Sequence, residues 1–174
     1  MKTTLLKSQL VGLLMIGLMG AGCRPSNPLI VRIVNVKAID DVCQKSVEVH
    51  LVGVNKSDKE RWDKESMTKY WEPENQLRRS AKNYTHVMQF GQGPCQQELD
   101  KKDPIRSIWK NRKTEYLFIL ADLPSIFEDV DGNADARRLR IPALNSECWP
   151  FFEDKININI ESGGIVCLTP QKCE

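Results

Sequence analysis

Oxygen-bearing side chains recur at every second position of residues 129–135, which read DVDGNAD. The four that could bind a cation are Asp129, Asp131, Asn133 and Asp135. Calcium takes such oxygens, but an EF-hand loop would need glycine where Ala134 stands and a bidentate glutamate where Arg140 stands. Aspartate, asparagine and glycine are also common residues of surface turns. A ligand- or calcium-binding module therefore stays an alternative function, and we expect no resident metal.

Catalytic chemistry has little support in the sequence. The chain has two histidines, His50 and His86, each in a segment with the alternation of a strand. We expect both to be solvated or to cap polar groups, rather than to act as bases. The sequence contains no G-x-S-x-G elbow, H-E-x-x-H helix or phosphate-binding glycine loop. We therefore expect a protein that is not an enzyme and needs no cofactor.

Two further groups of side chains could bind ligands. The first is Arg137, Arg138 and Arg140, and the second is Trp62, Tyr70 and Trp71. The arginines alternate in part with apolar residues, as the solvent-facing residues of a strand do, so we expect a solvated face. The aromatic rings could stack on a sugar, but large aromatic side chains are more often core residues. We expect them to close one end of a hydrophobic core.

The amino-terminal segment has the pattern of a secretion signal. Lys2 and Lys7 give a positive start, and residues 11–22 form an apolar run that ends in small residues. The run is shorter than the roughly 20 apolar residues that a membrane-spanning helix needs. We expect residues 1–22 to be removed as a signal peptide.

The cysteine that follows this run is a possible acylation site. Ala21 and Gly22 before Cys23 resemble the lipobox of bacterial lipoproteins, although Gly20 stands where that family usually has a branched residue. The resemblance implies lipidation of Cys23, as palmitate labelling would reveal. In that family an aspartate directly after the cysteine keeps the lipoprotein in the inner membrane. Arg24 stands at this position here, which implies that the protein is anchored to the periplasmic face of the outer membrane. The alternative is ordinary cleavage nearby, with Cys23 kept as a disulfide partner.

Charge and cysteine content narrow the partners and the compartment. The 25 lysines and arginines face 23 acidic residues, and without Lys2 and Lys7 the two counts are equal. A neutral chain does not favour nucleic acid. Five cysteines follow the leader: Cys43, Cys95, Cys148, Cys167 and Cys173. None forms a C-x-x-C pair, so in an oxidising compartment we expect two disulfides and one thiol, with the connectivity open.

The rest of the chain consists mainly of short segments with the alternation of β-strands. Strands are expected within 29–38, 46–55, 84–91, 116–123 and 137–144, with a hairpin over 155–168. The first two strands are expected to pair, and 116–123 is expected to be central because both its faces are apolar. A short amphipathic helix is expected between Ser57 and Pro73, and a long loop over 124–137. This order predicts a β-sandwich domain over 29–174, joined to Cys23 by the tether 23–28.

The order of these segments resembles the outer-membrane lipoprotein family of the type VI secretion system, the TssJ family. The resemblance is carried by LIVRIVNVKA, SVEVHLVGVN, the helix through WDKESMTKYW, YLFILADL and the terminal KININIESGGIVCL. It implies a transthyretin-like or immunoglobulin-like β-sandwich that binds an inner-membrane component of the secretion machine. The family uses the connection between its first two strands for this contact. Here the corresponding residues are Ile39, Asp40, Asp41 and Lys45, beside Cys43.

Overall fold

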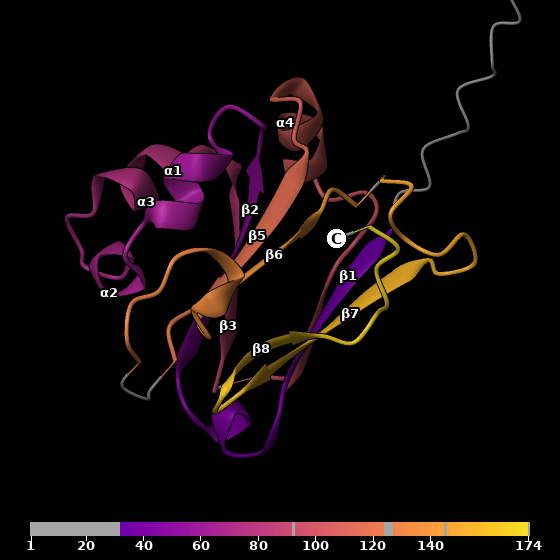
Figure 1. Cartoon of the computed structure of the whole chain (residues 1–174). Coiled ribbons are helices and arrows are strands. Elements are labelled where there is room, and N and C mark those ends of the chain that lie inside the picture. Colours follow the sequence, from indigo (N-terminus) through magenta and orange to yellow (C-terminus); the bar gives the residue numbers. More distant parts are fainter. Residues whose placement is uncertain (1–31, 92, 124–126, 145, 174) are drawn as a thin grey trace, which may run out of the picture.

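Two four-stranded sheets stack face to face in the part of the chain that the computed structural model describes, which is residues 32–91, 93–123, 127–144 and 146–173 (Figure 1). The expected β-sandwich is therefore confirmed. The expected signal peptide, Cys23 and most of the tether lie outside the described residues. Among the described helices, none has the length and apolar character needed to cross a bilayer.

The first sheet has the order β4-β1-β7-β8. Its strands are β1 (Ile33–Ala38), β4 (Gln96–Leu99), β7 (Lys155–Glu161) and β8 (Gly164–Cys167). Strand β1 runs antiparallel to β4 and parallel to β7, and β7 and β8 form the expected carboxy-terminal hairpin. Alternate residues of β1 and β7, such as Val34, Val36, Ile156 and Ile158, point into the core. This is the period of two that a half-buried strand requires.

The second sheet has the order β3-β2-β5-β6 and is antiparallel throughout. Its strands are β2 (Val47–Val54), β3 (Thr85–Phe90), β5 (Tyr116–Ala121) and β6 (Arg138–Pro142). As its apolar sequence predicts, β5 is an inner strand, with residues 117–121 all buried. One face of this sheet packs on the first sheet, and its other face is covered by helices.

The covering layer consists of α1 (Lys59–Lys64), α2 (Met67–Tyr70) and α3 (Gln76–Ala81), which gather beside the second sheet in Figure 1. Trp62, Met67 and Tyr70 from these helices pack with Val52 and Phe118 to form a second core. The prediction that Trp62 and Tyr70 are core residues is confirmed. The predicted single helix is a series of short ones, because Ser66 and Asn75 each accept a hydrogen bond from a backbone N–H of the helix they precede.

Helix α4 (Ile105–Asn111) packs against β2, and the 3₁₀ turns are η1 (Asp40–Gln44), η2 (Lys82–Tyr84) and η3 (Gly132–Ala134). A Cβ atom at Gly53 would stand 2.4 Å from the Trp109 ring, so only glycine lets α4 approach β2 this closely. The Trp109 indole N–H also donates to the carbonyl of Tyr84 (2.8 Å).

Two expectations about the strands are wrong. Strands β1 and β2 do not pair, because they belong to opposite sheets and the turn η1 connects one layer to the other. The edge strand β4, in the segment GPCQQELDKKDP, is absent from the strands that the sequence predicts. Only Leu99 of β4 is fully buried, so this strand has no apolar alternation that the sequence could display.

Candidate partner-binding surface

The turn η1 combines an inward-facing anchor with outward-facing charges. Val42 and Cys43 are buried, whereas Asp41 and Lys45 are exposed and form an ion pair with 2.6 Å between Oδ2 and Nζ. The hydrogen bond from Lys45 lowers the pKa of the Asp41 carboxyl. Ile39 is half-buried, and its N–H donates to Ile160 O (2.9 Å). The side chain of Asp40 lies outside the described residues.

Covalent and backbone constraints hold this turn in place. The disulfide Cys43–Cys95 ties it to the segment before β4, and Ala38 N–H donates to Cys95 O (2.8 Å). Gly91 follows β3 with φ of 104°, and a Cβ atom there would stand 2.3 Å from Lys45 O. The turn is thus a fixed projection at one end of the sandwich. A partner that binds it loses little free energy to ordering the turn, because the turn is already ordered.

The helices do not add aromatic anchors to this turn. Trp62 is only 1% exposed, so it has almost no surface that a partner could contact. Trp71 is half-buried, with the Arg78 guanidinium 5.1 Å from its ring centroid. In Figure 1 the three helices lie against the outer face of the second sheet, away from the end that carries the turn. The two features are therefore separate surfaces.

His50 is a structural residue beneath the helices, which corrects the expectation that it is solvated. It is 4% exposed, with Nδ1 2.7 Å from the Tyr70 hydroxyl and Nε2 2.5 Å from Glu48 Oε1. Arg78 Nη2 donates to the same Glu48 oxygen (2.8 Å), and Gln89 Nε2 donates to the other (2.5 Å). This network fastens α2 and α3 to β2.

The electrostatics of the network keep His50 neutral. Burial lowers the pKa of His50 despite the neighbouring Glu48 carboxylate, and burial raises the pKa of Tyr70. Nε2–H then donates to Glu48, and Nδ1 accepts from the Tyr70 hydroxyl. Both ring nitrogens are engaged, which leaves neither for a substrate. His86 is half-buried with Nδ1 3.5 Å from Asp103 Oδ2, and burial lowers its pKa also.

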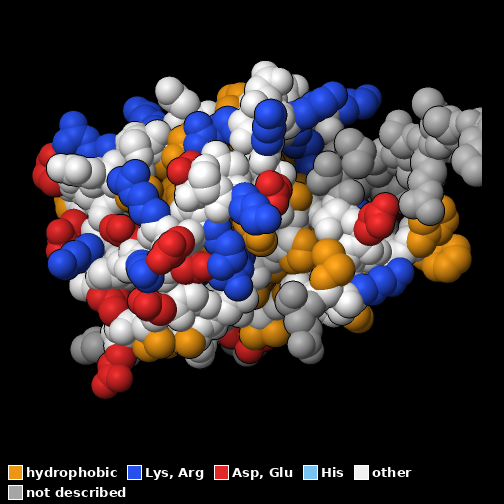
Figure 2. Space-filling view, turned by 45° about the horizontal axis from the view of Figure 1, so that its top comes forward, with side chains coloured by type: hydrophobic (Ala, Val, Ile, Leu, Met, Phe, Trp, Pro, Cys, Tyr) orange, Lys and Arg blue, Asp and Glu red, His pale blue; other side chains and the backbone are white. Residues whose placement is uncertain are grey.

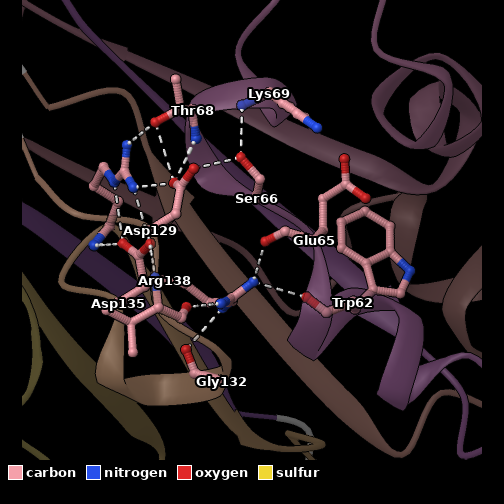
Figure 3. Close-up of polar contacts among 11 residues, drawn as sticks. Trp62, Glu65, Ser66, Thr68, Lys69, Asp129, Gly132, Asp135 and Arg138 are labelled. Carbon is pink, nitrogen blue, oxygen red and sulfur yellow. Dashed lines mark hydrogen bonds and ion pairs between the residues drawn. The ribbon is translucent and has the colours of Figure 1, made fainter.

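The acidic loop before β6 turns its carboxylates toward an arginine. Arg137 Nη2 donates to Asp129 Oδ1 (2.5 Å) and to Asp135 Oδ2 (2.9 Å). Asp129 also accepts from the Ser66 hydroxyl and from the Thr68 N–H, so it joins the loop to the start of α2 (Figure 3). These bonds hold the pKa of Asp129 well below its usual range, although burial alone would raise it.

The remaining residues of the proposed calcium set do not complete a cation site. Asn133 exchanges hydrogen bonds with the backbone of Arg140, and Asp131 is exposed. Within the described residues, no group of three or more histidine, cysteine, aspartate or glutamate side chains could hold a metal ion. The alternating acids of DVDGNAD build a loop around Arg137.

Arg138 corrects the expectation of a solvated arginine face, as Arg137 does. Its side chain is 2% exposed and donates to the carbonyls of Gly132 (2.8 Å), Trp62 (2.9 Å) and Glu65 (2.8 Å), and also to that of Val130 (Figure 3). Arg138 thereby satisfies carbonyls at the end of α1 and in the acidic loop. The alternation of residues along the strand could not reveal this, because the sequence does not distinguish an arginine that is buried and bonded to carbonyls from one that is solvated.

A shallow hollow of about 400 Å³ lies beside α4. Trp109, Leu117 and Leu144 contribute apolar surface to it, and Lys110 and Lys113 stand among its lining residues. No histidine, cysteine or carboxylate is among the described residues that line the hollow.

The sulfur chemistry agrees with the expectation of two disulfides and one thiol in the described part of the chain. The pairs are Cys43–Cys95 and Cys148–Cys173, and Cys167 is the free cysteine. Burial raises the pKa of the Cys167 thiol, so it is a poor nucleophile at neutral pH.

Comparison with known proteins gives a remote likeness to solved structures. No protein-family model and no curated protein match the chain. Among solved structures, Serratia marcescens Lip, described as a membrane bound component of the Type VI Secretion System, aligns with a TM-score of 0.48 and 13% sequence identity. The alignment covers 79% of this chain and 96% of that one. At this level the likeness does not assign a function.

Proposed function

We propose that this protein is an outer-membrane lipoprotein that faces the periplasm and serves as a structural adaptor in a type VI-like secretion complex. Cys23 carries the lipid, the sandwich is a rigid body, and the turn η1 binds an inner-membrane protein of the complex. The protein works through contacts and not through catalysis.

The observation that carries this proposal is the sequence IGLMGAGC, which places a cysteine directly after a secretion leader. A cysteine with a diacylglyceryl group and an amide-linked acyl chain has more than the roughly two-chain minimum for stable anchoring. The order of segments after the leader, which resembles the TssJ family, supports the secretion role.

The side chains that the sequence singled out for chemistry are engaged in structural contacts. The nitrogens of His50 are engaged in a buried network, and the Asp129 and Asp135 carboxylates are paired with Arg137. By contrast, Asp41 and Lys45 are exposed on a turn fixed by a disulfide. A preorganised turn with one charge of each sign suits recognition of a protein surface.

The anchor is tested by labelling cells with radioactive palmitate. The wild-type protein should incorporate the label and sediment with membranes, and Cys23→Ser should lose the label and enter the soluble fraction. Cys167→Ser is the matched control, because it removes a thiol without touching the leader. An unlabelled wild-type protein would refute the lipoprotein assignment.

The contact is tested by replacing Asp40 and Asp41 with lysine. Because Asp41 is exposed, the double variant should keep its melting temperature and capture less of the inner-membrane partner. Replacement of Glu60 and Glu74, which are exposed on the helical layer, is the matched control. Equal capture by both double variants would remove the turn from the interface.

A further inference from the structure

A second exposed feature lies at the end of the sandwich opposite the turn η1. Phe151 and Phe152 are 65% and 94% exposed, and their rings contact each other edge to face, with centroids 5.5 Å apart. Figure 2 shows hydrophobic side chains that protrude at one edge of the molecule. A phenylalanine pair this exposed is costly in water, so its position needs a reason.

Hydrogen bonds and a disulfide hold the turn that carries this pair in one conformation. The N–H of Glu153 donates to Pro150 O (3.2 Å), which closes a four-residue turn around the two rings. Trp149 before it is buried, with its indole N–H on Ala143 O (3.1 Å). The neighbouring Cys148 is tied to Cys173. The Phe turn, residues 150–153, is thus held firmly with its rings outward.

The Phe turn stands where the tether from Cys23 enters the domain. Arg32 donates to Glu153 O (2.8 Å) and Pro150 O (3.2 Å), and Ile33 N–H donates to Asp154 O (2.8 Å). On the other side, Arg106 of α4 donates to Arg32 O (2.7 Å). The first described residue of the chain therefore sits between α4 and the Phe turn.

The length of the tether limits how far this end can lie from an anchored Cys23. The nine residue steps from Cys23 to Arg32 reach at most about 30 Å. A domain of this size is roughly 37 Å across. A lipid on Cys23 is attached at the end of the domain that carries the Phe turn, and β1 separates this end from the turn η1 by about 20 Å. Because the reach of the tether exceeds that separation, the tether favours an orientation with the Phe turn toward the bilayer but does not fix it.

Two ion pairs flank the Phe turn, and the exposed Glu153 within it adds a negative charge. Lys101 lies 3.8 Å from Asp154, and Lys155 lies 2.8 Å from Glu98. The surface has no net attraction for anionic headgroups from these four residues. A contact with the membrane would rest on the aromatic rings and depend little on salt.

We propose that Phe151 and Phe152 insert into the headgroup–acyl boundary of the bilayer that holds the lipid of Cys23, so that the domain stands with the turn η1 directed into the periplasm. This inference rests on the proposed lipid anchor and adds an orientation to it. The occupant of the Phe turn is the lipid surface, and a protein at this site would be a different result.

The test uses the full-length gene, so that the chain is processed and lipidated, and the purified protein is placed in liposomes of phosphatidylethanolamine and phosphatidylglycerol. Cys167→Ala removes the free thiol of the described residues, so that it cannot react with the label. An environment-sensitive fluorophore is then attached to the cysteine introduced by Phe152→Cys. Val130→Cys is the matched control, because Val130 is 45% exposed and lies in the acidic loop beside α2. Quenching by nitroxide lipids and by aqueous iodide is measured for both.

We expect nitroxide lipids to quench the probe at 152 several-fold more than the probe at 130, and iodide to show the reverse order at both low and high salt. Phe151→Ser should reduce the lipid quenching at 152. Lipidated protein with equal iodide access at both positions would overturn this inference and leave the anchor intact. Protection of the probe in native envelopes but not in liposomes would indicate a protein occupant and also overturn it. Absence of lipid by intact mass would instead refute the proposed function.

Discussion

Removal of the Cys43–Cys95 disulfide is the perturbation that best examines how the turn η1 is held. The bond closes a loop of 52 residues, and loop entropy predicts that its loss lowers the free energy of unfolding by about 4 kcal/mol. For roughly 140 residues the unfolding entropy is about 0.3 kcal/mol/K, so the melting temperature should fall by about 13 °C. The bond between Cys148 and Cys173 closes 25 residues and should contribute about 3.5 kcal/mol.

The assay compares Cys43→Ala/Cys95→Ala with Cys148→Ala/Cys173→Ala by urea unfolding and by hydrogen exchange. Both pairs lose a disulfide, but only the first should increase amide exchange in residues 39–45, because Cys43 lies in that turn. Capture of the inner-membrane partner should weaken in the first variant and not in the second. A loss below about 1 kcal/mol with unchanged exchange in the turn would show that the backbone bonds hold it alone, and would refute the reasoning.

Three further results are expected. Lowering the pH from 7.5 to 5 should lower the melting temperature, because burial lowers the pKa of His50 and His86. The unfolded chain takes up protons near the ordinary histidine pKa of about 6.5, before the folded chain does, so acid favours unfolding. His50→Gln should make the melting temperature depend less on pH. Arg138→Met should cost about 3 kcal/mol or more in urea unfolding, because several buried carbonyls lose their donor, whereas the exposed Arg79→Met should cost little; equal losses would contradict this role. Millimolar calcium should neither release heat in calorimetry nor raise the melting temperature, because Arg137 already occupies the Asp129 and Asp135 carboxylates, and a rise would restore the calcium-binding alternative.

The strands could be predicted where burial on one face leaves a period of two in the sequence. Ile156, Ile158 and Ile160 alternate with polar residues in β7, and that segment forms the predicted hairpin. The pairing partner of a strand could not be predicted in this way, because periodicity carries no information on which strands lie side by side. Strand β1 pairs with β7, more than a hundred residues away, rather than with the neighbouring β2.

The buried polar residues could not be predicted from the same pattern. His50 occupies the polar phase of β2, but the helices cover that face and bring the Tyr70 hydroxyl to its ring. Arg138 occupies the first position of β6 and is buried because carbonyls from α1 and the acidic loop converge on it. The pairing of Glu48 with His50 had a sequence signal, since residues two apart in a strand share a face. The contribution of Arg78 from α3 had none.

In-cell photo-cross-linking tests the central claim most directly. A photoreactive amino acid is placed at Asp41 in the turn or at Glu60, whose side chain is 78% exposed on the helical layer. Irradiation should attach an inner-membrane protein of the secretion complex through position 41, and Cys23→Ser should abolish that adduct by releasing the domain from the membrane. A partner attached through position 60 and not through 41, or an adduct that persists without Cys23, would contradict the account of a lipid-anchored adaptor.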